Sequence, residues 1–155
     1  MQYFDPEINQ NYVPYVVETS IGLDRMFLTI LSNAFCEDEV NGEKRLVLNI
    51  PPMLAPVKAA ILPLTKKDGL PEKAREIMRL LQADFNCQYE EKDSIGKRYR
   101  RQDAIGTPYC VTVDHQSLED QTVTLRDRDS MDQERVLIQE LPNIISKKVD
   151  FKYFM

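Results

Sequence analysis

From Val57 onward, segments with the hydrophobic spacing of a β-strand alternate with segments that have the spacing of an α-helix. The run from Val57 to Leu64 is almost wholly apolar, which predicts a strand buried on both faces of a sheet. Residues 70–85 then place apolar side chains at intervals of three and four, which predicts an amphipathic helix. Gly69 separates the two segments, and Pro71 suits the first helical turn because no backbone donor is missed there.

The same alternation continues toward the end of the chain. Further strands are predicted at 86–91 and 108–113, and helices at 94–105 and 141–149. Val123 and Leu125 alternate with polar residues, and Val136 and Ile138 repeat that pattern, so the two segments predict a hairpin with one buried face. Together the elements predict an α/β fold whose mixed sheet of about five strands is flanked by helices.

The first 56 residues are organised differently. An aromatic and β-branched run at 12–17 predicts a strand that ends at Gly22, and apolar residues at helical spacing from Leu23 to Phe35 predict a helix. The acidic stretch 37–43 predicts a turn or linker, and residues 45–56, broken by three prolines, predict an extended connector. We therefore expect three parts: a strand and helix at 1–44, a connector at 45–56 and a domain at 57–155.

The composition describes a soluble globular chain with a local basic patch. Its 155 residues, 43% hydrophobic and 29% charged, suit about one domain with a core of its own. A net charge of −5 excludes a protein that coats nucleic acid through bulk positive charge. The densest basic segment contains Lys92, Lys97, Arg98, Arg100 and Arg101. A phosphate-binding face, with Tyr99 stacking on a base, and an ordinary solvated helix face explain this segment equally well.

Cysteine, histidine and apolar runs exclude several classes of protein. Cys36, Cys87 and Cys110 lack the paired spacing of a zinc site, so we predict reduced core residues and no metal site. His115 is the only histidine, which excludes a histidine metal cluster and predicts an ordinary surface or strand-end position. No apolar run approaches about 18 residues, and the N-terminus lacks a leader pattern. We therefore expect a cytoplasmic protein that neither spans a membrane nor is exported.

Short motifs in a fixed order carry a family resemblance. Residues 17–25, VETSIGLDR, resemble motif 3 of class II aminoacyl-tRNA synthetases in its glycyl form. Four later segments resemble the anticodon-binding domain of the same enzymes: 54–56, 61–64, 94–103 and 126–129. The similarity covers nearly the whole chain and weakens after about Glu140. The chain thus resembles the C-terminal part of the glycyl-tRNA synthetase family, and because it opens directly before motif 3 we expect it to be a piece of a longer protein.

The resemblance implies a role for each motif 3 residue. Gly22 would permit a tight turn against a ligand, and Arg25 would stack on the adenine of ATP and pair with a phosphate oxygen. Glu18 and Ser20 have the same strand parity and would line the amino-acid pocket, with Glu18 countering the glycine ammonium. Motifs 1 and 2 are absent, so we expect this fragment to be inactive without the remainder of the catalytic domain.

The resemblance also implies partners. The full-length enzyme would activate glycine with ATP and Mg²⁺, transfer it to tRNA(Gly) and form a homodimer. For the fragment itself we expect no cofactor and no DNA or membrane partner. An accessory or structural subunit built on the same domain, such as a polymerase processivity partner, is the alternative, although such a subunit has no need of Glu18 and Ser20. An independent enzyme is not supported, because the chain has no nucleophile motif or phosphate-cradling glycine loop.

Strand parity predicts which residues read the anticodon. Arg126 and Arg128 alternate with the buried valine and leucine of their strand, so both are expected on the exposed face, and the resemblance assigns Arg128 to base reading. Glu119 lies in the turn that enters this strand, where related domains place a base-reading acid, and a carboxylate can accept from the amino group of cytosine. The basic residues of 92–101 would hold the backbone phosphates. The alternative is that these charged residues form surface ion pairs.

Overall fold

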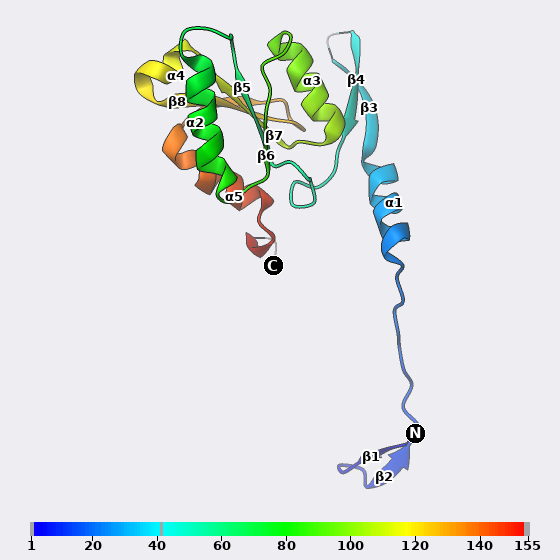
Figure 1. The fold of residues 1–155 in the computed structure, drawn as a ribbon. Coiled ribbons are helices and arrows are strands. Elements are labelled where there is room, and N and C mark those ends of the chain that lie inside the picture. The colour runs from blue at the N-terminus through cyan, green and yellow to red at the C-terminus, as the bar shows by residue number, and fades with distance from the viewer. Residues whose placement is uncertain (1, 41, 154–155) are drawn as a thin grey trace.

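The computed structural model describes residues 2–40 and 42–153 and consists of an α/β body with an N-terminal arm (Figure 1). In the described part, the body contains one sheet of five strands in the order β6-β5-β7-β8-β9. These strands are β5 Ala59–Pro63, β6 Cys87–Tyr89, β7 Tyr109–Val113, β8 Thr122–Asp127 and β9 Gln133–Leu137. β5 is parallel to β6 and β7, whereas β8 is antiparallel to β7 and β9. The predicted mixed sheet is confirmed.

Helices cover both faces of this sheet. α2 (Leu70–Gln82) and α5 (Leu141–Val149) pack on one face and α3 (Ile95–Ile105) on the other, while α4 (His115–Asp120), η1 (Ile138–Glu140) and η2 (Phe151–Tyr153) are short. The larger core, on the α2 side, includes Ile61, Leu125 and Ile145, each at most 2% exposed. A smaller core under α3 includes Leu62 and Cys110. Because α2 and α3 lie on opposite faces, every residue of β5 is buried.

The N-terminal arm differs in part from the prediction. β1 (Tyr3–Asp5) and β2 (Gln10–Tyr12) form a small hairpin, and residues 13–22 continue as an irregular, exposed segment. α1 (Leu23–Ala34) confirms the predicted helix. The predicted strand at 12–17 is wrong for all but its first residue. Strand-forming side chains need a neighbouring strand to satisfy their backbone groups, and no described residue pairs with 13–17.

Amide hydrogen exchange is expected to be much faster at Tyr15 to Val17 than at Ala59 to Leu62. The first stretch has no ladder hydrogen bonds among the described residues, whereas β5 is paired on both sides and buried. Hydrogen–deuterium exchange followed by mass spectrometry of peptides from the isolated chain measures both rates. Equal protection would contradict the expectation and point to a dimer that pairs these segments.

Two paired strands occur where the sequence predicts an acidic linker. β3 (Phe35–Val40) pairs with β4 (Glu43–Leu48) in antiparallel register. Basic residues of β4 offset the acids of β3, since Lys44 lies 2.8 Å from Glu37 and Arg45 lies 2.7 Å from Asp38. The predicted connector therefore begins as a strand, and only residues 49–58 are irregular.

The three cysteines are free, and two of them are buried. Cys87 and Cys110 lie in the core as predicted, whereas Cys36 is exposed on β3, contrary to the prediction. Burial raises the pKa of Cys87 to about 11 and that of Cys110 to about 12. Both buried thiols therefore stay protonated at neutral pH.

Alkylation of the native chain is expected to occur at Cys36 alone. Iodoacetamide reacts with the thiolate, so a buried thiol with a raised pKa is protected both by packing and by protonation. Brief treatment at mildly alkaline pH, followed by mass mapping, measures the modification at each position. After unfolding in denaturant all three positions should react, and native modification of Cys110 at the rate of Cys36 would contradict the packing.

Candidate nucleic-acid interface

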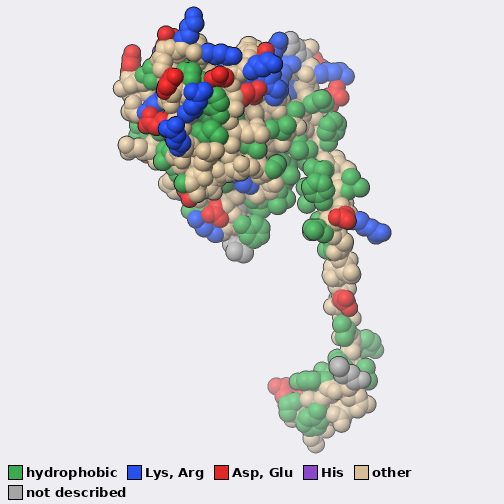
Figure 2. Space-filling model, in the orientation of Figure 1, with side chains coloured by type: hydrophobic (Ala, Val, Ile, Leu, Met, Phe, Trp, Pro, Cys, Tyr) green, Lys and Arg blue, Asp and Glu red, His purple; other side chains and the backbone are tan. Residues whose placement is uncertain are grey.

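The carboxyl ends of β5, β6 and β7 meet along one edge of the sheet, the upper edge in Figure 1. α3 begins at this edge after β6, and α4 follows β7 there. Such an edge, with helices leaving toward opposite faces, is where α/β proteins commonly bind ligands. Lys and Arg side chains gather over the same upper part of the body (Figure 2). The start of α3 and Glu119 in α4 are thus brought to one edge.

Most of the predicted phosphate-binding residues are accessible. Lys92, Lys97, Arg100 and Arg101 are exposed in and just before α3. Arg101 lies 2.9 Å from the carboxylate of Asp93 and also pairs with Glu90. Asp93 and Glu90 therefore offset part of the local positive charge.

Arg98 is buried instead of facing solvent. It is 2% exposed, and its guanidinium donates to the carbonyl oxygens of Pro63 at 2.7 Å and Glu90 at 3.2 Å. The expected exposure of Arg98 is wrong, because α3 turns this position toward the sheet together with Gln102, four residues later and also buried. Burial lowers the pKa of Arg98. Because so many residues of 92–101 are charged, nothing in the sequence indicates that the side of α3 carrying Arg98 faces the sheet.

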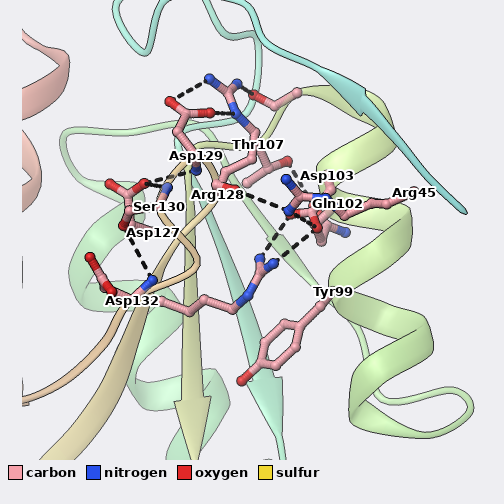
Figure 3. A network of polar contacts seen from close by, with 12 residues as sticks. Arg45, Tyr99, Gln102, Asp103, Thr107, Asp127, Arg128, Asp129, Ser130 and Asp132 are labelled. Atoms are coloured by element: carbon pink, nitrogen blue, oxygen red, sulfur yellow. Dashed lines mark hydrogen bonds and ion pairs between the residues drawn. The ribbon is translucent and has the colours of Figure 1, made fainter. Parts of the chain in front are cut away.

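Arg126 is also buried, at 5% exposure. Its guanidinium forms two hydrogen bonds with the carboxylate of Asp103, at 2.8 and 3.0 Å, and lies 4.7 Å from the ring centre of Tyr99. The hydroxyl of Tyr99 is 2.6 Å from that of Thr112, so its ring is fixed against the sheet beside Asp103 (Figure 3). Strand parity correctly separates Arg126 from the larger core, but α3 covers the opposite face at this point. The expected exposure of Arg126 is therefore wrong.

Arg128 is the most extensively bonded of these side chains and is 1% exposed. It donates to the carbonyl oxygens of Leu48, Ile50 and Gly106 at 2.9 to 3.0 Å, and to the side chain of Asn49 at 3.0 Å. Asp129 accepts two further bonds, at 2.6 and 3.0 Å (Figure 3). The expected exposure of Arg128 is wrong, because the segment after β4 folds over it.

Arg45 links these groups and had no role in the sequence prediction. It is 5% exposed, and it donates to Asp103 at 3.2 Å, to the backbone oxygen of Arg128 at 3.2 Å and to Asp38 at 2.7 and 2.9 Å. The bond to Asp38 is the main cause that raises the pKa of Arg45 and lowers that of Asp38. We call Arg45, Arg126, Arg128, Asp38 and Asp103 the arginine cluster. The only sequence signal for Arg45 was its position inside an apolar strand-like run.

Glu119 is exposed as expected, in α4 rather than in a turn. Nearby on β9, Arg135 faces the same side of the sheet as its cross-strand neighbour Thr124. The guanidinium of Arg135 contacts both carboxylate oxygens of Asp114 and donates to the hydroxyl of Thr122 at 2.6 Å. That contact lowers the pKa of Asp114. The sequence prediction missed Arg135, although the hairpin register would have placed it beside Thr124.

The four motif 3 residues lie in the arm. Glu18, Ser20 and Gly22 are exposed in the irregular segment, and Arg25 is exposed in the first turn of α1. Gly22 has φ −77° and ψ 127°, a conformation open to any residue. The shared strand face expected for Glu18 and Ser20 is not formed. Among residues 2–40 and 42–153, no cluster of three metal-ligating side chains occurs, and no helix is long and apolar enough to cross a membrane.

The fold agrees with comparisons to known proteins. Residues 58–148 match the family described as "Anticodon binding domain", and the chain belongs to this family. Over nearly its whole length, the sequence of the chain is similar to those of glycine–tRNA ligases. It is 55% identical to that of Clostridium tetani over 152 residues, 97% of this chain and 32% of the relative. It is 52% identical to that of Chlorobaculum tepidum over 149 residues, 96% of this chain and 32% of the relative.

A solved structure supports the fold assignment. The RNA-binding domain of threonyl-tRNA synthetase from Cryptosporidium parvum Iowa II superimposes with a TM-score of 0.59 and 24% identity, over 64% of this chain and 25% of that chain. The resemblance to glycyl-tRNA synthetases found in the motifs is confirmed by the ligase relatives. The chain spans about a third of the length of those relatives.

Proposed function

We propose that the chain is the anticodon-binding part of a glycine–tRNA ligase and that its partner is tRNA(Gly). The observation that carries the proposal is 55% identity to such a ligase across 97% of the chain, with the anticodon-binding family match inside it. The complete enzyme would activate glycine with ATP and Mg²⁺ in the cytoplasm, as a homodimer. The relatives give no support to an accessory subunit.

The proposed RNA contacts lie along the carboxyl edge of the sheet. Glu119 is exposed there and supplies a carboxylate that can accept from a cytosine amino group. Lys92, Lys97 and Arg100 are exposed on and before α3 and would hold phosphates of the RNA backbone. The burial of Arg98, Arg126 and Arg128 removes the reason for giving these three direct contacts, so we assign them structural roles: Arg98 bonds Pro63 at this edge, whereas Arg126 and Arg128 lie toward the opposite end of the sheet.

The arm would contribute one wall of the catalytic site. Arg25 is suited to adenine and phosphate, and Glu18 and Ser20 to glycine, by charge and hydrogen-bonding capacity. All three are exposed and separate from the body, which suits side chains completed by the rest of a longer enzyme. Activation of glycine also needs a second arginine, which motif 2 supplies to bind the α-phosphate. Without that arginine the isolated chain would not activate glycine.

Glu119→Ala in the ligase is expected to reduce discrimination between anticodons. A wild-type protein should prefer a glycine anticodon stem-loop over one whose cytosines are replaced, and loss of a base contact should reduce that preference by about 1–3 kcal/mol. Fluorescence anisotropy with the two RNAs measures both affinities. Arg100→Ala should instead weaken both complexes alike and flatten their salt dependence.

The matched control for this experiment is Glu134→Ala, an exposed acid near the opposite edge of the sheet. It should leave both affinities unchanged. If Glu119→Ala preserves full discrimination, the anticodon is read elsewhere. If the wild-type protein binds neither RNA more tightly than an unrelated stem-loop, the proposed function itself fails.

A further inference from the structure

The hairpin β3–β4 and the segment after it are held to the α/β body by buried arginines. Arg128 donates to two backbone carbonyls and one side chain of residues 48–50, and a further bond to Gly106 ties the same guanidinium to the end of α3. A planar guanidinium presents its donors in a rigid fork, so these acceptors can be satisfied only in one relative placement. Arg128 therefore fixes residues 48–50 against the body.

A second attachment lies beside the first. Asp103, which is fully buried in α3, binds Arg126 from β8 and Arg45 from β4. Arg45 continues to Asp38 on β3, so the ion pairs run from the centre of the body to the outer strand of the hairpin. The two attachments hold the hairpin at separate points along its length, which prevents it from pivoting about either one.

This hairpin continues directly from α1. α1 ends at Ala34 and β3 begins at Phe35, and Ala34 packs with Ile50 and Ala55 in a small core of its own. The placement of the hairpin consequently sets the direction of α1, whose first turn carries Arg25. The RNA-binding edge and Arg25 thus belong to two parts joined through the arginine cluster.

We propose that Arg128 is a positioning residue that sets the RNA-binding body relative to the catalytic part, and that it does not read a base. The inference rests on the proposed function. In the complete enzyme, the body holds the anticodon while the tRNA 3′ end must reach the glycine site. A small rotation of the body would leave anticodon binding intact and misplace the 3′ end, and misplacement by about 1 Å can cost about a hundredfold in rate.

The test uses Arg128→Lys in the full-length ligase, because lysine retains the charge but lacks the fork. We expect kcat/KM for charging of intact tRNA(Gly) to fall at least about tenfold, mainly through kcat. Affinity for the anticodon stem-loop, and its preference for cytosines, should stay within about twofold of wild type. Glycine-dependent pyrophosphate exchange without tRNA should be unchanged. Arg75→Lys, a half-exposed arginine elsewhere on the body, is the matched control.

The results that would contradict this inference can be told apart from one another. Loss of anticodon discrimination in Arg128→Lys would make Arg128 a base reader and overturn the inference, and unchanged charging would overturn it as well. If Arg128→Lys does not fold, Asn49→Ala decides by the same criteria, since it removes one acceptor of Arg128 and leaves the body intact. A wild-type enzyme that does not charge tRNA(Gly) would refute the proposed function, and this inference with it.

Discussion

Asp103→Ala is expected to lower the free energy of unfolding by about 3–5 kcal/mol, the usual cost of removing one partner from a buried ion pair. Asp103 is fully buried and accepts from both Arg45 and Arg126, so the substitution leaves the buried Arg126 without its carboxylate and Arg45 with Asp38 alone. Since a domain of this kind is stable by about 5–15 kcal/mol, the loss removes a large fraction of the total. Urea denaturation followed by circular dichroism measures it.

A surface ion pair provides the control for this experiment. Asp93 pairs with Arg101 at 2.9 Å but is exposed, so Asp93→Asn should leave the urea midpoint nearly unchanged, since asparagine tolerates the φ of +71° at this position. Asp103→Asn retains hydrogen-bond acceptance without the charge and should fall between wild type and Asp103→Ala. A midpoint for Asp103→Ala equal to that of Asp93→Asn would show that the buried cluster contributes no net stability.

Gly106→Ala is expected to destabilise the chain by about 2–4 kcal/mol, combining left-handed backbone strain with overpacking. Gly106 ends α3 at φ +84°, and an added Cβ would lie 2.9 Å from a methyl carbon of Ile50 and 3.0 Å from the backbone oxygen of Leu48. The substitution therefore pushes residues 48–50 away from the body as well as straining the helix end.

A matched glycine separates these two effects. Gly69 has φ +79° but no atom within 4 Å of an added Cβ, so Gly69→Ala should show the strain alone, about 1–2 kcal/mol. Thermal unfolding of both variants gives the difference, which reports the contact with residues 48–50. Equal destabilisation of the two variants would mean that this segment moves aside without cost.

The body was predictable because its elements carry local signals. The apolar run of β5 and the helical spacing of α2 each fix an element without reference to the rest of the chain, and their order then restricts the topology. The strand predicted at 12–17 failed for the opposite reason, since β-branched residues indicate a preference that only a pairing neighbour can satisfy. The acidic hairpin was missed because its acids pair with Lys44 and Arg45 across the turn, a contact that the acidic stretch alone does not indicate.

The exposure expected for the candidate site residues is found only where it follows from one element alone. Glu119 and Lys97 are exposed, but Arg98 and Arg126 are covered by packing between the sheet and α3. Alternation along a strand assigns a residue to a face, and does not say whether another layer lies on that face. Arg128 lies just beyond the end of β8, where alternation no longer applies, and apart from Asp129 its partners are far away in the sequence.

The partners of Arg128 on the segment after β4 are mostly backbone oxygens, those of Leu48 and Ile50. Such an attachment recognises the path of the chain and not the identity of its side chains. Over evolutionary time these bonds would permit replacement of the side chains at 48 and 50 by others of suitable size. They would resist insertion or deletion of even one residue between β4 and position 50, because a shift in register removes both acceptors together. The spacing of this segment is therefore under stronger constraint than its composition.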